Sequence, residues 1–185
     1  MAVLSIVAAG VVTGWPAAAG PVVDPLPLTL PDTTTTVALA RVTEGTLLLR
    51  GVREDTVEGV LAPGDPIALY AAHGLDGLKA LRDAGDPITR RLDALLAPVD
   101  SPPPHIGAGN NFADHQAEVA VHDTPALFPK MATPTPWNAP IPPATRLDWE
   151  AELCGVALAP ITADGPVALG FVLCHDSTDR WRMLT

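Results

Sequence analysis

Basic residues are scarce in this sequence. Its 185 residues include 11 Lys and Arg against 21 Asp and Glu, which gives a net charge of −10. A nucleic-acid-binding protein needs a basic face to neutralise phosphates, and a polybasic membrane patch needs clustered Lys and Arg. The charge balance therefore excludes both as predicted functions.

Cysteine is almost lacking, with only Cys154 and Cys174 present. Two cysteines are too few for a disulfide scaffold or a four-cysteine zinc site. We expect both to serve as small apolar side chains, with a disulfide between them as the lesser alternative.

Charged residues are also few, at 17%, whereas apolar residues reach 48%. That apolar share supplies a packed core and excludes a wholly disordered chain. The 21 prolines and 15 glycines break regular structure, so the sequence predicts short strands, loops and few helices. The length suits one domain, or one domain plus an appendage.

The N-terminus has no charged residue before Asp24. Its apolar run is about long enough to cross a membrane, at roughly 20 residues, although glycines and Pro16 interrupt it. Three alanines after Pro16 fit a signal-peptide cleavage site, but no basic residue precedes Arg41. One interpretation is therefore a membrane anchor or export signal, and with it a bacterial envelope location. The other is a buried N-terminal strand of a cytosolic domain.

A proline-rich stretch, 21–36, follows and is typical of an extended spacer. We therefore expect residues 1–36 to form an appendage. Residues 37–104 are expected to form a small α+β lobe and a linker. Residues 105–185 then form the functional part.

The lobe begins with apolar segments that predict strands. Glu44-Gly45 is a turn signal between two of them and predicts a hairpin. Three strands are expected, at 37–42, 46–52 and 57–61.

Leucines at helical spacing predict two short helices in the lobe, one around Leu78 and one around Leu95. Gly85-Asp86-Pro87 separates them. His73 is interpreted as a solvated loop residue, so nothing in this lobe suggests catalysis.

Polar residues become more specific after the linker. Residues 105–111 predict a short strand and a glycine turn, and residues 112–118 predict a short helix. His115 and Glu118 are three residues apart and share one face of that helix. A carboxylate beside an imidazole orients it and raises its basicity, as a general base requires. The alternative is a solvated surface pair.

The segment 147–154 alternates polar and apolar residues with period two. On a strand, Asp148, Glu150, Glu152 and Cys154 share one face. Neighbouring carboxylates repel one another, and a hard cation such as Mg²⁺, Mn²⁺ or Ca²⁺ relieves that repulsion. The alternative is a solvent-exposed strand face.

The apolar run 168–174 predicts a buried strand that ends at His175-Asp176. A charge that closes a buried strand needs a partner. If this strand neighbours the segment 147–154, then Glu150, Glu152 and Asp176 could cluster around one metal ion.

Four segments, in order, resemble the fumarylacetoacetate hydrolase family. They are GAGNNFADHQAE, PALFPK, IPPATRLDWEAEL and GFVLCHDSTDR. Members of the family typically show G-x-N-Y-x-x-H-x-x-E, F-x-K, D-[YW]-E-x-E-L and N-D-x-[ST]-x-R-D. The resemblance covers about residues 105–180.

The resemblance implies a mixed β-roll and a homodimer if the domain is complete. It also implies a Mg²⁺ site, or one for Mn²⁺ or Ca²⁺, formed by Glu150, Glu152 and Asp176. His115 and Glu118 would be the dyad that activates water or moves a proton. Lys130, in the F-x-K segment, would either reach the substrate or point to solvent.

The sequence also departs from the family. Phe112 replaces the usual Tyr, His175 the usual Asn, and Trp181 the usual Asp. The later family segment, with a catalytic lysine and a Gly-Pro-rich loop, is not found. We therefore expect an incomplete roll with an exposed edge beside the strand ending at Asp176. The chain by itself is expected to have little or no activity.

The reaction implied by the resemblance is hydrolysis of a C–C bond in a β-dicarbonyl or acylpyruvate substrate, through a metal-bound enolate. A 2-oxo acid decarboxylase, hydratase or isomerase on the same site is the alternative enzyme. A non-catalytic fragment, or an envelope-anchored binding protein, is the alternative from another class.

Overall fold

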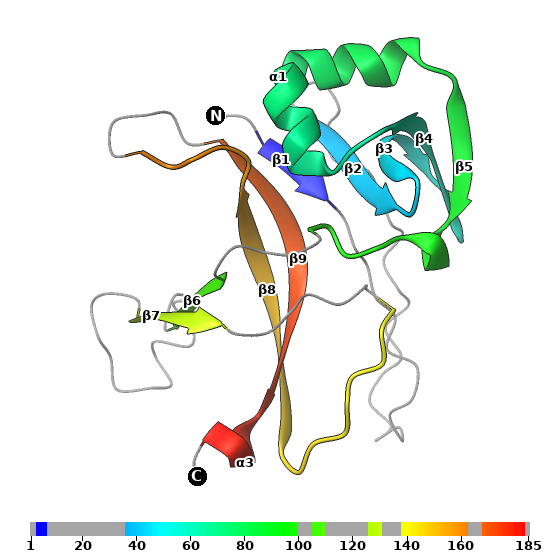
Figure 1. Ribbon diagram of the computed structural model, residues 1–185. Helices are drawn as coiled ribbons and strands as arrows, with labels where there is room; N and C mark the ends of the chain where they lie inside the picture. Colours follow the sequence, from blue (N-terminus) through cyan, green and yellow to red (C-terminus); the bar gives the residue numbers. More distant parts are fainter. Residues whose placement is uncertain are drawn as a thin grey trace. The chain divides into compact units, whose positions relative to one another are not determined.

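The computed structural model describes residues 3–6, 36–99, 105–109, 126–130, 138–162 and 168–183 (Figure 1). The chain forms two compact units. One unit combines Met1–Pro98 with Thr135–Thr185, and the other is Val99–Pro134. Each is described by itself. The three-part division expected from the sequence stays a prediction.

A mixed sheet of seven strands forms the first unit, in the order β5-β4-β3-β2-β1-β9-β8. β1 runs parallel to both of its neighbours, and the other neighbours pair antiparallel. The strands are β1 (Val3–Ile6), β2 (Thr36–Val42), β3 (Gly45–Val52), β4 (Thr56–Ala62), β5 (Pro87–Arg91), β8 (Leu147–Ala157) and β9 (Leu169–Asp179). The predicted α+β class is therefore present in its general form. The specific β-roll stays a proposal.

The strands β2, β3 and β4 form an antiparallel meander, which confirms the three strands predicted in this lobe. The turn between β2 and β3 contains Glu44, as expected. Both faces are buried over most of β2 and over Thr46–Leu49 of β3. This explains why their sequences are nearly continuous apolar runs rather than alternating ones.

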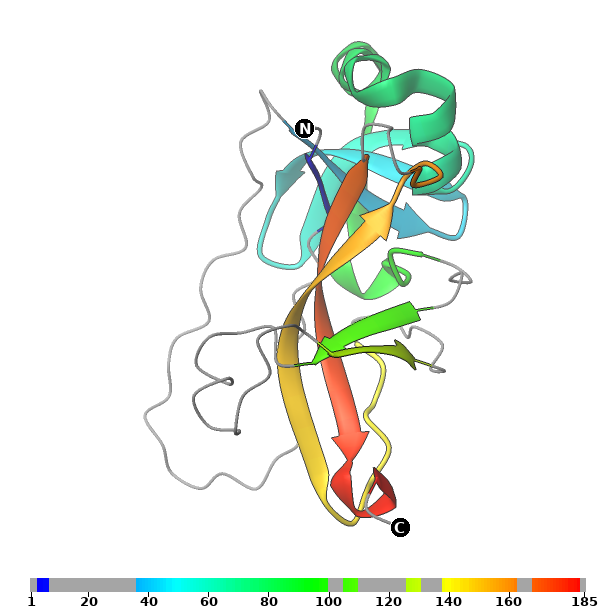
Figure 2. The ribbon, with the colours of Figure 1, turned by 90° about the vertical axis from the view of Figure 1, so that its left-hand side faces the viewer.

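The helix α1 (Pro66–Ala84) packs against β2, β3 and β4 (Figure 2). Its first turn is capped by Asp65, whose Oδ1 accepts hydrogen bonds from the backbone N–H groups of Ile67 and Ala68. The helix is kinked at Gly74, where φ is 60°. Such a backbone conformation suits glycine because it has no Cβ.

The second helix predicted around Leu95 is wrong. Residues from Pro87 form β5, which pairs with β4, and only the short 3₁₀ helix η1 (Leu92–Ala94) follows. The backbone N–H of Leu96 donates to the carbonyl of Arg41. Strand pairing and this long-range hydrogen bond therefore outweigh the helical spacing of the leucines.

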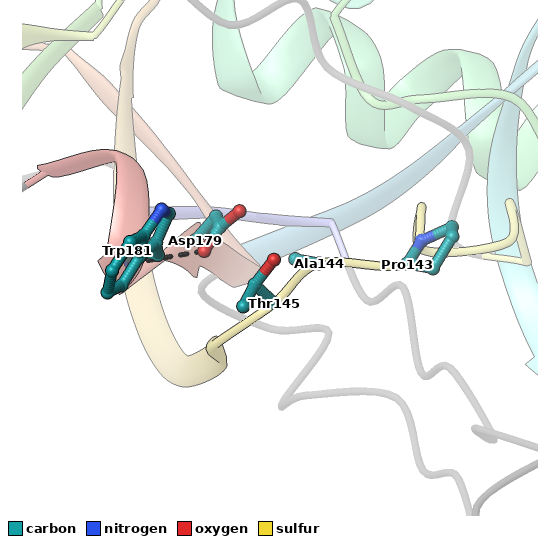
Figure 3. Close-up of a pocket in the computed structure, with 5 residues that line it drawn as sticks. All are labelled: Pro143, Ala144, Thr145, Asp179 and Trp181. Carbon is teal, nitrogen blue, oxygen red and sulfur yellow. Dashed lines mark hydrogen bonds between the residues drawn. The ribbon is translucent and has the colours of Figure 1, made fainter. Parts of the chain in front are cut away.

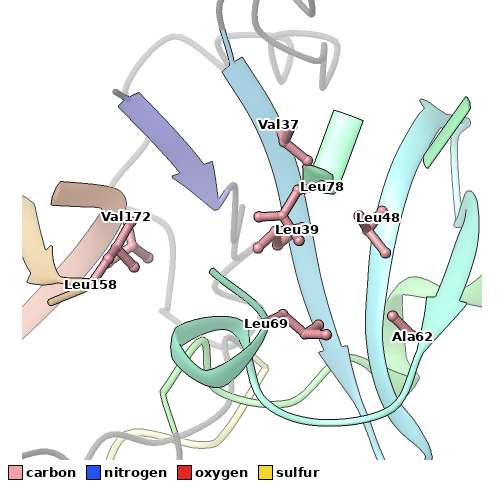
Figure 4. Packing of buried hydrophobic residues seen from close by; sticks show 8 residues of the cluster. All are labelled: Val37, Leu39, Leu48, Ala62, Leu69, Leu78, Leu158 and Val172. Carbon is pink, nitrogen blue, oxygen red and sulfur yellow. The ribbon is translucent and has the colours of Figure 1, made fainter. Parts of the chain in front are cut away.

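Two apolar clusters lie in the first unit. The cluster that includes α1 also contains two residues of the β8–β9 part of the chain, so it ties that part to the meander (Figure 4). Its members are Val37, Leu39, Leu48, Ala62, Leu69, Leu78, Leu158 and Val172. The second cluster contains alternate residues of β2 and β3 together with Val57 and Leu95.

The second unit contains an antiparallel pair, β6 (His105–Gly109) and β7 (Ala126–Lys130). Gly107 lies opposite Phe128. A Cβ on Gly107 would lie 2.5 Å from the Phe128 ring, so the missing side chain leaves room for that ring. The strand expected within residues 105–111 is therefore present.

At the N-terminus, Val3–Ile6 form a strand in the interior of the seven-stranded sheet. This agrees with the strand interpretation for these four residues. Most of the predicted spacer lies outside the described residues. Within the described part of the chain, no helix has the length and apolarity needed to cross a membrane.

Candidate functional site

The three carboxylates predicted as metal ligands lie on one face of the β8–β9 hairpin. The two strands pair with Glu150 directly opposite Asp176 and with Glu152 opposite Cys174. Opposed residues share a face, with Cβ atoms about 4.5–5.5 Å apart. The sequence predicted a shared site only if these two strands are neighbours, and the structure shows that they are.

The two faces of this hairpin differ in exposure. The carboxylate face, with Glu150, Glu152 and Asp176, is half-buried along β8 and β9. The opposite face is exposed, and the Trp149 and Leu153 on it have about three fifths of their surface in solvent. The polar face, rather than the apolar one, is thus the more enclosed of the two.

Arg180 opens the short helix α3 (Arg180–Met183) and binds two carboxylates of this face. Its Nε donates to Oδ2 of Asp148 at 2.8 Å, and its Nη2 donates to Oε1 of Glu150 at 2.5 Å. The Arg180 hydrogen bond, helped by the backbone N–H of Trp149, lowers the pKa of Asp148 below its ordinary value. Asp148 is therefore ionised at neutral pH.

Backbone hydrogen bonds at the end of β9 position Arg180. Oδ1 of Asp179 accepts hydrogen bonds from the backbone N–H groups of Arg146 and Trp181, at 3.3 and 3.1 Å. The backbone N–H of Arg180 donates to the carbonyl of Arg146 at 3.0 Å. These contacts join the end of β9 to the start of β8, beside the carboxylates.

Cys154 and Cys174 form a disulfide between β8 and β9. The expectation of two unlinked apolar side chains is therefore corrected. The register explains the difference: Cys154 lies opposite Val172 and Cys174 opposite Glu152, so the cysteines are diagonal neighbours on the same face. Their Cα atoms are 6.1 Å apart, which is within disulfide range.

The donor set suits a hard divalent cation, because it consists of carboxylate oxygens on one half-buried face. Within the described ranges, however, no three His, Cys, Asp or Glu side chains gather closely enough to hold a metal ion. One intended ligand, Glu150, is bound by Arg180 instead. The donor chemistry therefore fits the metal, whereas the side chains are placed for a guanidinium.

Three further predicted site residues are His115, Glu118 and Lys130. His115 and Glu118 lie outside the described residues, as does the helix predicted for them. Lys130 belongs to β7 in the second unit, where its Nζ is 5.7 Å from the centroid of the Phe128 ring. That distance is within cation–π range. The roles of these three residues stay predictions.

His175 lies on the face opposite to the carboxylates. Its ring stacks on Trp149 with centroids 6.1 Å apart, and its Nδ1 is 3.0 Å from Oγ of Ser177. It therefore takes no part in the carboxylate face, although it precedes Asp176 directly.

A shallow, open hollow lies where β9 ends and α3 begins (Figure 3). Its lining residues are Pro143, Ala144, Thr145, Asp179 and Trp181. None of the predicted site residues lines it.

Sequence reasoning gave no role to Arg180 and no partner to Asp148. The signal was present for both. Arg180 occupies the Arg position of the N-D-x-[ST]-x-R-D pattern, and Asp148 belongs to the alternating segment of β8. What the pattern could not show is that the two segments meet across one hairpin.

No protein-family model matches the chain, and no curated protein matches its sequence.

Proposed function

We propose that this chain is a metal-dependent hydrolase of the fumarylacetoacetate hydrolase type. In this proposal it cleaves a C–C bond in a β-dicarbonyl or acylpyruvate substrate. The observation that carries the proposal is the register of the β8–β9 hairpin. It puts Glu150 opposite Asp176, with Glu152 on the same face, and these are the residues that the resemblance assigns to the metal.

The ligands in this proposal are Glu150, Glu152 and Asp176. A bound Mg²⁺ or Mn²⁺ supplies Lewis acidity toward the two oxygens of a dicarbonyl substrate. The carboxylates hold that charge on the half-buried face. Partial exclusion of water from this face strengthens their electrostatic interaction with it.

The acid–base part of the proposal belongs to His115 and Glu118. His115 removes a proton from water, and Glu118 orients the imidazole and stabilises its protonated form. Lys130 is proposed to interact with the substrate. All three roles rest on the motifs that resemble the family.

Metal binding tests the proposal most directly. We expect calorimetric titration of the full chain with MgCl₂ and MnCl₂ to show one site. Glu152→Gln should weaken binding at least tenfold, because it removes both a ligand and a negative charge. The matched control is Glu54→Gln, which changes an exposed glutamate outside the hairpin and should bind metal like the wild type.

Turnover is the second readout. Any conversion of acylpyruvate or oxaloacetate should require Mg²⁺ and be lost in His115→Ala. A folded chain that binds no divalent ion, or a Glu152→Gln variant with wild-type affinity, would refute the proposal.

A further inference from the structure

We propose that Arg180 is an internal cation that occupies the metal-binding face and competes with the divalent ion for Glu150. This inference rests on the function proposed above and deepens it. It explains why the three carboxylates share a face and yet do not gather around one point.

The geometry shows what the guanidinium does. Arg180 bridges two side chains of β8, with Nε on Asp148 and Nη2 on Glu150. These carboxylates are two residues apart on the same face of the strand. A planar guanidinium has the fork of donors needed to hold both at once.

The same contacts oppose a metal. Oε1 of Glu150 accepts the hydrogen bond from Arg180, so a divalent ion that binds this oxygen must displace the guanidinium. The positive charge beside the site also repels an incoming cation. Asp148 offers the released guanidinium a partner, since it is already hydrogen-bonded to Nε.

The exchange of the Arg180 guanidinium for a metal ion at Glu150 therefore links two states of the site. Without metal, Arg180 holds Asp148 and Glu150 together. With metal, Glu150 turns to the ion and Arg180 stays on Asp148. Arg180 therefore lowers the affinity for the metal, because the ion has to displace it from Glu150.

Two substitutions should move the affinity in opposite directions. Arg180→Gln removes the competing cation, so Mg²⁺ and Mn²⁺ should bind about fivefold more tightly, as expected for loss of one half-exposed ion pair. Asp148→Asn removes the partner that receives Arg180 in the metal-bound state, so binding should weaken by about the same factor.

Arg180→Lys and Arg146→Gln complete the set. Lys keeps the charge but lacks the fork, so its affinity should lie between those of the wild type and Arg180→Gln. Arg146 is an exposed arginine near the same end of the hairpin, and no hydrogen bond or ion pair is found for its side chain in the described part of the chain. Arg146→Gln changes the net charge equally and should leave the affinity within about twofold, because long-range attraction is screened by salt.

The experiment is calorimetric titration of the full-length variants with MgCl₂ in 0.15 M NaCl as the working salt concentration. Titration with MnCl₂, followed by electron paramagnetic resonance, gives an independent measurement. Circular dichroism first establishes that each variant is folded. If Arg180→Gln does not fold, Arg180→Lys and Asp148→Asn still test the two opposite directions.

The outcomes separate the two proposals. Tighter binding in Arg180→Gln and weaker binding in Asp148→Asn, each relative to the wild type, support the inference. Unchanged or weaker binding in a folded Arg180→Gln, with binding in the wild type, overturns the inference alone and indicates a purely structural arginine. Lack of binding in every folded variant overturns both the metal site and the competition.

Discussion

At the residue scale, one guanidinium serves several carboxylates on the β8–β9 hairpin. Arg180 binds Asp148 and Glu150, while Glu152 and Asp176 carry further negative charge on the same face. Neighbouring carboxylates on one face repel one another, and a cation relieves that repulsion, which is the physical basis of the proposed metal site.

Asp148 should make part of the protein's stability depend on pH. Arg180 lowers its pKa in the folded state below that in the unfolded chain, which is about 3.9. The folded state thus binds fewer protons. Its added stability is full above the unfolded pKa and is lost as the pH falls through the lower, folded pKa.

The test is the urea midpoint of the wild type and Asp148→Asn between pH 6 and pH 2, covering the window of the lowered pKa. The wild type should be the more stable at pH 6, and the difference should shrink in acid. Asp86→Asn is the control, because it changes an exposed aspartate outside the β8–β9 hairpin. A gap between wild type and Asp148→Asn that is constant over this range would contradict the ion pair.

At the element scale, the C-terminus of α1 depends on an arginine of β3. Arg50 donates hydrogen bonds to the carbonyls of Arg82, Asp83 and Gly85. The last carbonyls of a helix have no partner within it, and a positive charge there also interacts favourably with the helix dipole. Arg50 thus caps the C-terminus of α1 and joins it to β3.

Arg50→Met should therefore destabilise the protein by about 2 kcal/mol, because charged hydrogen bonds to half-buried carbonyls are lost. Chemical denaturation followed by circular dichroism measures this. The control is Arg53→Met, at an exposed position in the turn after β3, which should stay within about 0.5 kcal/mol of wild type. Equal effects of the two variants would show that Arg50 does not cap α1.

The disulfide between Cys154 and Cys174 should stabilise the β8–β9 hairpin. It closes a loop between residues 20 apart in sequence, so its reduction should lower the free energy of unfolding by about 3 kcal/mol. The denaturation midpoint with and without a phosphine reductant gives this number. Mass spectrometry after maleimide labelling should find two reactive thiols only after reduction. Labelling of both cysteines in the unreduced, denatured chain would show that the bond does not form.

At the scale of the whole molecule, the sequence predicted the elements whose patterns are local. The alternation in β8 and the apolar runs of β2 and β3 each depend on the strand's own residues, and all three strands were predicted. β5 was missed because α1 separates it in the sequence from its partner β4, so their pairing is not a local pattern. That Glu150 and Asp176 share a face could be proposed only on the condition that their strands are neighbours, because it depends on the register of the two strands. Arg180 was missed for the same reason.

The N-terminal strand joins the two halves of the sheet. β1 lies between β2 and β9, and its Ser5 pairs with Ala38 on one side and Phe171 on the other. A proline in an interior strand removes a ladder hydrogen bond and is not tolerated there. Ser5→Pro should therefore destabilise the protein by about 2 kcal/mol, as expected for a buried backbone partner left unpaired.

Hydrogen exchange measured by mass spectrometry locates the effect of this proline. Backbone amides of β2 and of residues 169–172 in β9 should exchange faster in Ser5→Pro, because both strands lose their shared neighbour. The matched control is Ser5→Ala, which keeps the backbone N–H and should preserve the protection. Equal protection in Ser5→Pro and the wild type would show that these residues are not part of the sheet. Such a result would favour the alternative interpretation of the apolar N-terminus as an anchor or export signal.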